Sequence, residues 1–271
     1  MEVTNDNQNI TKDSLGRLES EFLTRIGPLG LFTLKDASRI IAPDREKYVR
    51  QFLARLKKKG WIERVKPGLF AVIPLSSGAE RTPQIHEFLI AMRLVEPAAI
   101  SYLSAMNYHG LTEQLPRQVF IATNHKITRP TRESLGFSYR IITHRPERFF
   151  GVRKEWINES PFVITDIEKT IVDGLAMPEY VGGVGIIAHA FSAAWSKIDE
   201  KRLHEYAVRI GISAVVKRLG FLLETLAIGN PEELRCSTEL STGYPRLDPT
   251  LPPQGTHNRR WGLLVNAKVH P

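Results

Sequence analysis

Hydrophobic residues in the first part of the chain recur at helical spacing in three short segments. The first segment, residues 12–26, has apolar side chains three or four positions apart, at Leu15, Leu18, Phe22 and Ile26. Gly27, Pro28 and Gly30 then end it. A second helix is predicted to begin at Thr33, a capping residue that has Asp36 three positions later.

The third segment has the strongest helical pattern. Asp44 is a favoured N-cap residue, and Glu46 lies in the first turn, where the helix dipole stabilises negative charge. The apolar residues that form the predicted buried stripe of this helix are Val49, Phe52, Leu53 and Leu56. Gly60 suits the left-handed position just past a helix end.

Two short β-rich runs follow, residues 61–65 and 69–73, around the turn Lys66-Pro67-Gly68. Pro-Gly suits a type I or II turn better than the primed turns of two-residue hairpins, so we expect a longer loop. Three short helices and a hairpin predict a winged helix-turn-helix over residues 12–75. In that fold the third helix enters the major groove, and the wing tip contacts a phosphate or the minor groove.

The positive charge of the chain is concentrated in this region. The 271 residues carry a formal net charge of +8, of which residues 1–75 contribute +5. Residues 45–66 alone hold 9 basic and 2 acidic residues. A lysine run such as 57–59 is also what a solvated helix end favours. Together with the fold order and the basic wing, however, the charge favours nucleic-acid binding.

A helical projection places four residues of the third helix opposite its buried stripe: Lys47, Gln51, Ala54 and Lys58. Long donors and one aromatic residue flank them, and no carboxylate does. The predicted DNA-contacting residues are Thr33, Lys35, Arg45, Lys47, Tyr48, Arg50, Gln51, Arg55, Lys58, Arg64 and Lys66.

Residues 76–271 predict a second, α+β domain, and residues 1–11 a flexible N-terminus. The segments predicted to be helical are 84–95, 97–109, 165–177, 181–196, 199–210 and 213–227. Between them, "RQVFIAT", "FSYRIIT", "ERFFGV" and "SPFVIT" predict a sheet of about four strands, and "RWGLLVNAKV" predicts a last strand. The fold class is therefore α+β, with an N-terminal winged helix-turn-helix and a mixed α+β C-terminal domain.

No catalytic or metal site is predicted. Asp166, Glu168, Lys169 and Asp173 resemble a nuclease centre in composition, but a Thr-x-x-Glu capping box explains Glu168 without a metal. The eight histidines lack ligand spacing, and no Gly-x-Ser-x-Gly occurs. "GGVG" at 182–185 is interpreted as a helix start rather than a phosphate loop. We therefore expect no enzyme activity and no cofactor.

The remaining observations concern compartment and a second basic region. A polar N-terminus, one cysteine and no long apolar run predict a cytoplasmic protein. Seven basic residues are scattered through the predicted sheet: Lys126, Arg129, Arg132, Arg140, Arg145, Arg148 and Arg153. They are interpreted as a solvated sheet face, with a second anion-binding surface as the alternative. Trp156, Trp195 and Trp261 are expected in the core or between domains.

Four segments in this order and spacing resemble the AbiEi family, the antitoxin component of type IV (abortive infection) toxin–antitoxin systems. These are "KKGWIERVKPGLFAVIP", "AISYLSAMNYHGL", "VITDIEKTIVDGLAMPEYVGGV" and "RLDPTLPPQGTHNRRWGLLVN". The resemblance implies a repressor that binds inverted repeats in its own promoter. It also implies a C-terminal domain that counteracts a nucleotidyltransferase-like toxin without a stable direct complex. The alternatives are a free-standing regulator with a ligand-sensing second domain and, less favoured, a nucleic-acid-processing enzyme.

Overall fold

The computed structural model describes residues 15–74, 77, 83–236 and 238–269 and divides into two compact units. The first unit holds the described residues up to Ile90 together with Glu133–Phe137, and the second holds the rest. The predicted tail (1–11) and the predicted boundary between residues 75 and 76 lie outside the described residues.

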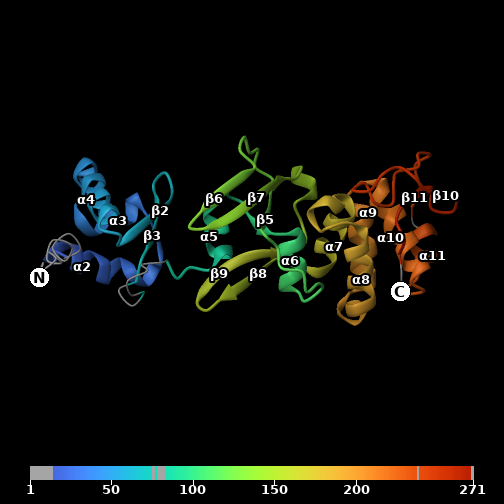
Figure 1. Ribbon diagram of the computed structural model, residues 1–271, viewed down its shortest axis with the longest axis horizontal. Coiled ribbons are helices and arrows are strands. Elements are labelled where there is room, and N and C mark those ends of the chain that lie inside the picture. Colours follow the sequence, from blue (N-terminus) through green and yellow to red (C-terminus); the bar gives the residue numbers. More distant parts are fainter. Residues whose placement is uncertain (1–14, 75–76, 78–82, 237, 270–271) are drawn as a thin grey trace, which may run out of the picture. The chain divides into compact units, whose positions relative to one another are not determined.

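The first unit is a winged helix-turn-helix (Figure 1). Its elements are α2 (Arg17–Ile26), η1 (Gly27–Leu29), β1 (Leu31–Thr33), α3 (Leu34–Ile41), α4 (Glu46–Lys58), β2 (Ile62–Lys66) and β3 (Leu69–Val72). Strand β3 is central and pairs antiparallel with both β1 and β2. The predicted fold class is confirmed. Strand β1 was missed because three residues are too short to show a period.

The two predicted helix caps of this unit have opposite outcomes. Thr33 caps α3 as expected: its Oγ1 accepts from the backbone N–H of Asp36 at 3.2 Å, and Asp36 accepts from the Thr33 N–H at 2.9 Å. Asp44 as the cap of α4 is wrong, because the N-cap is Arg45, which makes no side-chain cap hydrogen bond. Asp44 lies instead in a turn that the Arg45 N–H closes onto the Ala42 carbonyl at 3.3 Å.

Helix α4 packs on the core of the first unit through its predicted stripe. Val49, Phe52, Leu53 and Leu56 are all fully buried, which confirms the prediction. The Phe22 ring lies edge-on to Phe32 and Phe52, with centroids 5.7 and 5.4 Å away. Gly60 has a φ of +74° just past the helix, as predicted.

The wing is tighter than predicted. Lys66 pairs with Leu69, so the loop is only Pro67 and Gly68, and the expected longer loop is wrong. Gly68 has a φ of +78°, the value that the third residue of a type II turn requires. The register shifts between Arg64 and Lys66. This bulge supplies the extra twist that lets a non-primed turn close the hairpin.

The second unit is built on a six-stranded mixed sheet in the order β6-β7-β5-β4-β9-β8. The strands are β4 (Ala99–Ile100), β5 (Val119–Thr123), β6 (Thr131–Ser134), β7 (Phe137–Thr143), β8 (Val152–Ile157) and β9 (Ser160–Thr165). Pairs β5–β7 and β4–β9 are parallel, and β4–β5 and β8–β9 are antiparallel. The segment Glu133–Phe137, which holds the end of β6 and the first residue of β7, groups with the first unit.

The prediction of four strands needs two corrections. Strands β4, β6 and β8 were missed because β4 has two residues and the other two are polar edge strands. "ERFFGV" is wrong as a strand: its first residues belong to η3 (Pro146–Arg148), and Phe150 packs into the core. Gly151 has a φ of +63°, and a Cβ there would lie 2.7 Å from that of Lys169.

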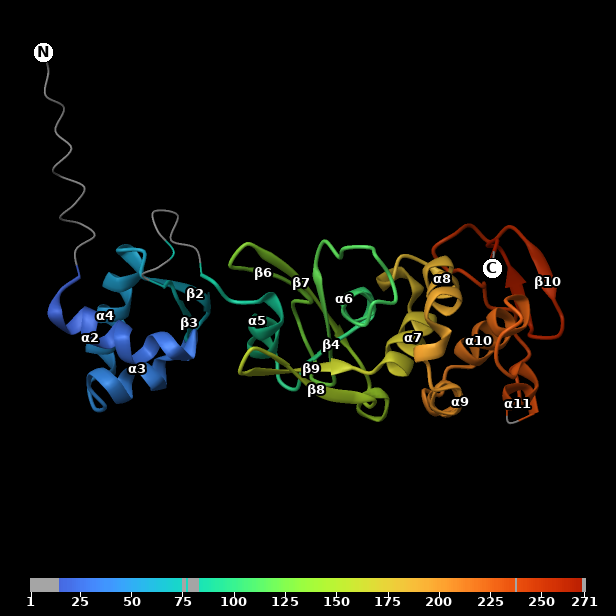
Figure 2. The ribbon, with the colours of Figure 1, turned by 90° about the horizontal axis from the view of Figure 1, so that it is seen from below.

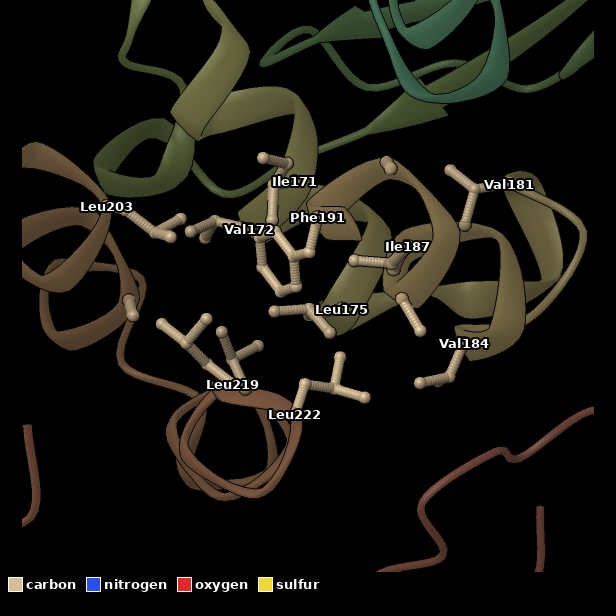
Figure 3. Close-up of a cluster of buried hydrophobic side chains, with 14 of the residues drawn as sticks. Ile171, Val172, Leu175, Val181, Val184, Ile187, Phe191, Leu203, Leu219 and Leu222 are labelled. Carbon is tan, nitrogen blue, oxygen red and sulfur yellow. The ribbon is translucent and has the colours of Figure 1, made fainter. Parts of the chain in front are cut away.

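The helices that accompany this sheet are α5 (Glu87–Leu94), α6 (Tyr102–Tyr108), α7 (Ile167–Ala176), η4 (Pro178–Tyr180), α8 (Val184–Ala194), η5 (Trp195–Lys197), α9 (Glu200–Arg209), α10 (Ser213–Thr225) and α11 (Pro231–Cys236). Helices α7 to α11 lie together at one end of the sheet in both views, whereas α5, whose residues up to Ile90 group with the first unit, lies near the other end (Figures 1 and 2). Side chains from α7 to α10 point toward one another in the large core (Figure 3). Among the described residues, no helix is long and apolar enough to cross a membrane.

The C-terminal segment closes this core through one buried carboxylate. Strands β10 (Thr256–Asn258) and β11 (Leu263–Val265) form a hairpin. Asp248 Oδ2 accepts from the Val184 N–H at 2.8 Å and so caps α8, which has no cap of its own. Trp261 is fully buried, as expected, whereas Trp156 is 57% exposed and is not a core residue.

Candidate nucleic-acid interface

The outward face of α4 is exposed and polar. Lys47, Gln51, Ala54 and Lys58 are all exposed on the side opposite the buried stripe. The side chains of Lys47, Gln51 and Lys58 make no hydrogen bond or ion pair with a described residue. Three extended donors with no internal partner are available to an external acceptor.

One flank of that face is charge-compensated. Arg50 Nε donates to Glu46 Oε1 at 2.9 Å, one turn back on the same helix. Lys57 Nζ lies 3.1 Å from Glu63 Oε1 on β2. Sequence reasoning missed both partners. The Glu46–Arg50 pair was detectable as an i,i+4 spacing, but Glu63 reaches Lys57 across a turn whose geometry the sequence does not give.

The lysine run therefore divides into three roles. Lys57 pairs with Glu63, Lys58 faces outward, and Lys59 Nζ lies 2.6 Å from Glu19 Oε2 on α2. Burial works to raise the pKa of Glu19, yet hydrogen bonds from Lys59 and from the Gly16 backbone lower it below its ordinary value. Lys59 thus ties the end of α4 to α2, a structural role.

On the opposite flank of α4, Arg55 has no acidic side chain in an ion pair with it among the described residues. The Arg55 guanidinium lies 5.8 Å from the centroid of the Phe52 ring, within the range of a cation–π contact, and the residue is exposed. Tyr48, on the same flank, is 39% exposed. The open part of the surface is therefore the outward face together with the Arg55 side.

The predicted contact residues divide by exposure. Those that are exposed are Lys35, Arg45, Lys47, Tyr48, Arg50, Gln51, Arg55, Lys58 and Arg64. Thr33 and Lys66 are half-buried. The Thr33 hydroxyl already bonds to the Asp36 carboxylate at 2.6 Å, so the cap occupies it. Arg64 and Lys66 lie on β2 at the wing, and the other residues lie on or beside the helix-turn-helix.

Three of the seven basic residues in the sheet region bond within the protein. Arg140 Nη1 donates to Thr131 Oγ1 at 3.1 Å, and Arg153 Nε lies 2.9 Å from Glu155. Arg148 Nε donates to the Ile210 carbonyl at 3.0 Å. These three side chains are therefore engaged within the protein, which favours the solvated sheet face at their positions.

The acidic side chains of α7 and its N-cap bond to different partners and do not form one shared site. Asp166, not Thr165, is the N-cap, and it accepts from the Lys169 N–H at 2.8 Å. Glu168 accepts from the Asp199 N–H at 2.8 Å and lies 3.5 Å from Arg202, so the predicted capping box is wrong. Thr165 is the last residue of β9, and its hydroxyl bonds to that of Thr170.

The remaining pair of that segment is buried. Lys169 Nζ bonds to Asp173 Oδ1, and the same ammonium lies 4.8 Å from the Phe150 ring centroid. Burial lowers the pKa of Lys169, and Asp173 opposes that shift. Within the described part of the chain, no three His, Cys, Asp or Glu side chains are placed to hold a metal ion.

Among the comparisons with known proteins, the match to a family model falls in the first unit. Residues 23–73 match a family model described as "Transcriptional regulator, AbiEi antitoxin", which confirms the predicted family over those residues. No curated protein matches the chain. The chain is similar in structure to the RV2827C protein from Mycobacterium tuberculosis, with a TM-score of 0.63 and 12% identity over 93% of this chain and 92% of that one. At that identity the likeness shows the fold.

Proposed function

We propose that this chain, whose winged helix matches the AbiEi transcriptional regulators, is a cytoplasmic autorepressor and antitoxin. In this proposal the first unit binds inverted repeats in its own promoter through α4 and the wing. The second unit counteracts a nucleotidyltransferase-like toxin without forming a stable complex with it. The chain acts as a binding protein and not as an enzyme.

One observation carries the DNA-binding part of the proposal. The outward face of α4 presents Lys47, Gln51 and Lys58 with no internal partner, next to Arg55, on the helix that a winged helix inserts into the major groove. Phosphates are the anions that such an array of long donors neutralises. The α7 carboxylates, in contrast, are engaged in caps and ion pairs, which favours the non-enzymatic proposal.

Promoter binding tests this part directly. Duplex DNA from the chain's own upstream region is titrated with the full chain over a series of salt concentrations. We expect specific binding, and a plot of log K against log salt whose slope corresponds to several phosphates. Replacing both Arg55 and Lys66 by alanine removes two contacts, so the slope becomes shallower by about two.

A matched control removes equal charge elsewhere. Arg17 and Arg25 are exposed on α2, and their double alanine variant loses the same net charge. We expect this control to keep the wild-type slope. Equal effects of the two double variants would overturn the assigned surface, and absence of specific binding by the wild type would overturn the repressor proposal.

The antitoxin part needs its own experiment. Where a nucleotidyltransferase gene adjoins this one, its product is expressed with and without the full chain, and growth is measured. We expect the chain to restore growth, and the Arg55→Ala, Lys66→Ala variant to restore it equally well. If the wild type fails to restore growth, the antitoxin part of the proposal is overturned and only the regulator part stands. If the variant alone fails, the DNA-binding surface itself is needed to neutralise the toxin.

A further inference from the structure

The centre of the outward face of α4 is not occupied by a cation. Gln51 lies in the middle of the helix, with Lys47 one turn before it and Lys58 two turns after it. Its amide is exposed and has no partner among the described residues. An uncharged group contributes nothing to phosphate neutralisation, so its position at the centre of the face points to another role.

We propose that Gln51 reads the adenine of an A·T base pair in the major groove, a specificity that rests on the DNA-binding function proposed above. Adenine presents an acceptor (N7) and a donor (N6–H) at this edge. A glutamine amide has one acceptor oxygen and an NH₂ donor, so it pairs with both. A lysine or arginine has only donors and favours guanine instead.

The neighbour of Gln51 on this face suits the same base pair. Ala54 is exposed, three positions along the helix, and carries only a methyl group. A small residue lets the helix backbone approach the base edges, and an alanine methyl makes apolar contact with the thymine C5-methyl group. Gln51 and Ala54 thus offer complementary contacts to the two bases of one A·T pair, or of adjacent pairs.

The nearby cations are less suited to reading that position. Arg50 is hydrogen-bonded to Glu46 at 2.9 Å, and Lys57 lies 3.1 Å from Glu63. Arg55 and Tyr48 lie at the edge of the face, where a groove-bound helix meets the phosphate backbone. Of the three outward-facing side chains without a partner among the described residues, Lys47, Gln51 and Lys58, only Gln51 carries both a donor and an acceptor.

Selection from a library of randomised duplexes tests the inference without a known operator. The full chain selects bound duplexes, which are sequenced, and the same is done with Gln51→Ala, Gln51→Lys and, as the matched control, Lys58→Ala. A bidentate contact discriminates by roughly 5- to 150-fold against the wrong base. We expect Gln51→Ala to lose a preference of that size for adenine at one position, and Gln51→Lys to prefer guanine there.

The control separates base reading from general affinity. Lys58→Ala is expected to weaken binding to all sequences alike and to keep the adenine preference, with a salt slope shallower by about one. A wild-type chain that selects no motif would overturn the DNA-binding proposal itself. A wild-type motif that Gln51→Ala retains at every position would overturn the assignment of Gln51 alone.

Discussion

A single carboxylate, Asp248, holds together two segments that are far apart in the sequence. Its Oδ2 accepts from the Val184 N–H at 2.8 Å, and its Oδ1 accepts from the Thr250 N–H at 2.9 Å. It is 4% exposed, and a Cβ on Gly183 would lie 2.7 Å from its Oδ2. "YVGGV" and "RLDP", two parts of the resemblance to the AbiEi family, therefore form one structural contact.

Replacing Asp248 should destabilise the protein in a graded way. Asp248→Ala leaves a helix N–H without a partner, and we expect a loss of about 1–3 kcal/mol in the free energy of unfolding. Asp248→Asn keeps one carbonyl acceptor and should lose less. Urea denaturation measures both, with Asp44→Ala as an exposed control expected to change little. Equal stability of Asp248→Ala and the wild type would show that the cap contributes nothing.

Buried histidines should make the stability depend on pH. Burial lowers the pKa of His109, His144 and His204 below the ordinary value of 6.5. The unfolded chain then binds more protons than the folded one, so the free energy of unfolding falls as the pH drops below about 6.5. Denaturation over a pH series tests this. His144→Gln removes one titrating group and should flatten the slope, and an unchanged slope would exclude His144 as a contributor.

At the scale of elements, long periodic segments could be predicted from the sequence and short ones could not. The stripe of α4 and the Thr33 cap of α3 follow from local spacing, because both depend on neighbours within one turn. Strand β8 was not predicted because its middle residues, Arg153, Lys154 and Glu155, are polar like those of a loop. As an edge strand it takes its conformation from pairing with β9, which is information from elsewhere in the chain.

The candidate site shows the same division. Which residues of α4 face outward could be predicted from the helical period. Which of them keep a free charge could not, because Glu63 reaches Lys57 from β2 and Glu19 reaches Lys59 from α2. Likewise Glu168 bonds to the Asp199 N–H at the start of α9, a contact that no local motif predicts.

Variants at the N-cap of α4 can separate an effect on stability from an effect on DNA affinity. Arg45 occupies a position that favours Asn, Asp or Ser, and it makes no cap hydrogen bond. We expect Arg45→Asn to raise the free energy of unfolding by about 1 kcal/mol. The control, Arg45→Gln, removes the same charge without supplying a short capping side chain. If Arg45 contacts a phosphate, both variants should lose DNA affinity equally. Equal free energies of unfolding for the two variants would show that the asparagine cap adds no stability.

At the scale of the whole molecule, the winged helix-turn-helix has a hydrophobic core of its own and carries the whole of the proposed DNA-binding surface. Its hydrophobic core is closed by residues from Phe22 to Val72, and all eleven predicted contact residues lie between Thr33 and Lys66. The residues of the large core that α7 to α10 help to build in the second unit all lie beyond residue 100. The two units thus have separate cores, the usual condition for folding independently.

A fragment of residues 1–75, which holds every buried residue of that core, should therefore unfold cooperatively in urea and bind the promoter duplex with the same salt slope as the full chain. The slope counts the phosphates neutralised, and every cation assigned to that task lies within the fragment. Alanine at both Arg55 and Lys66 serves as the control in the fragment and should make its slope shallower by about two. A steeper slope for the full chain would show that basic residues of the second unit, such as Lys126 and Arg129, also meet the DNA. In that case the sheet face interpreted here as solvated would become part of the binding surface.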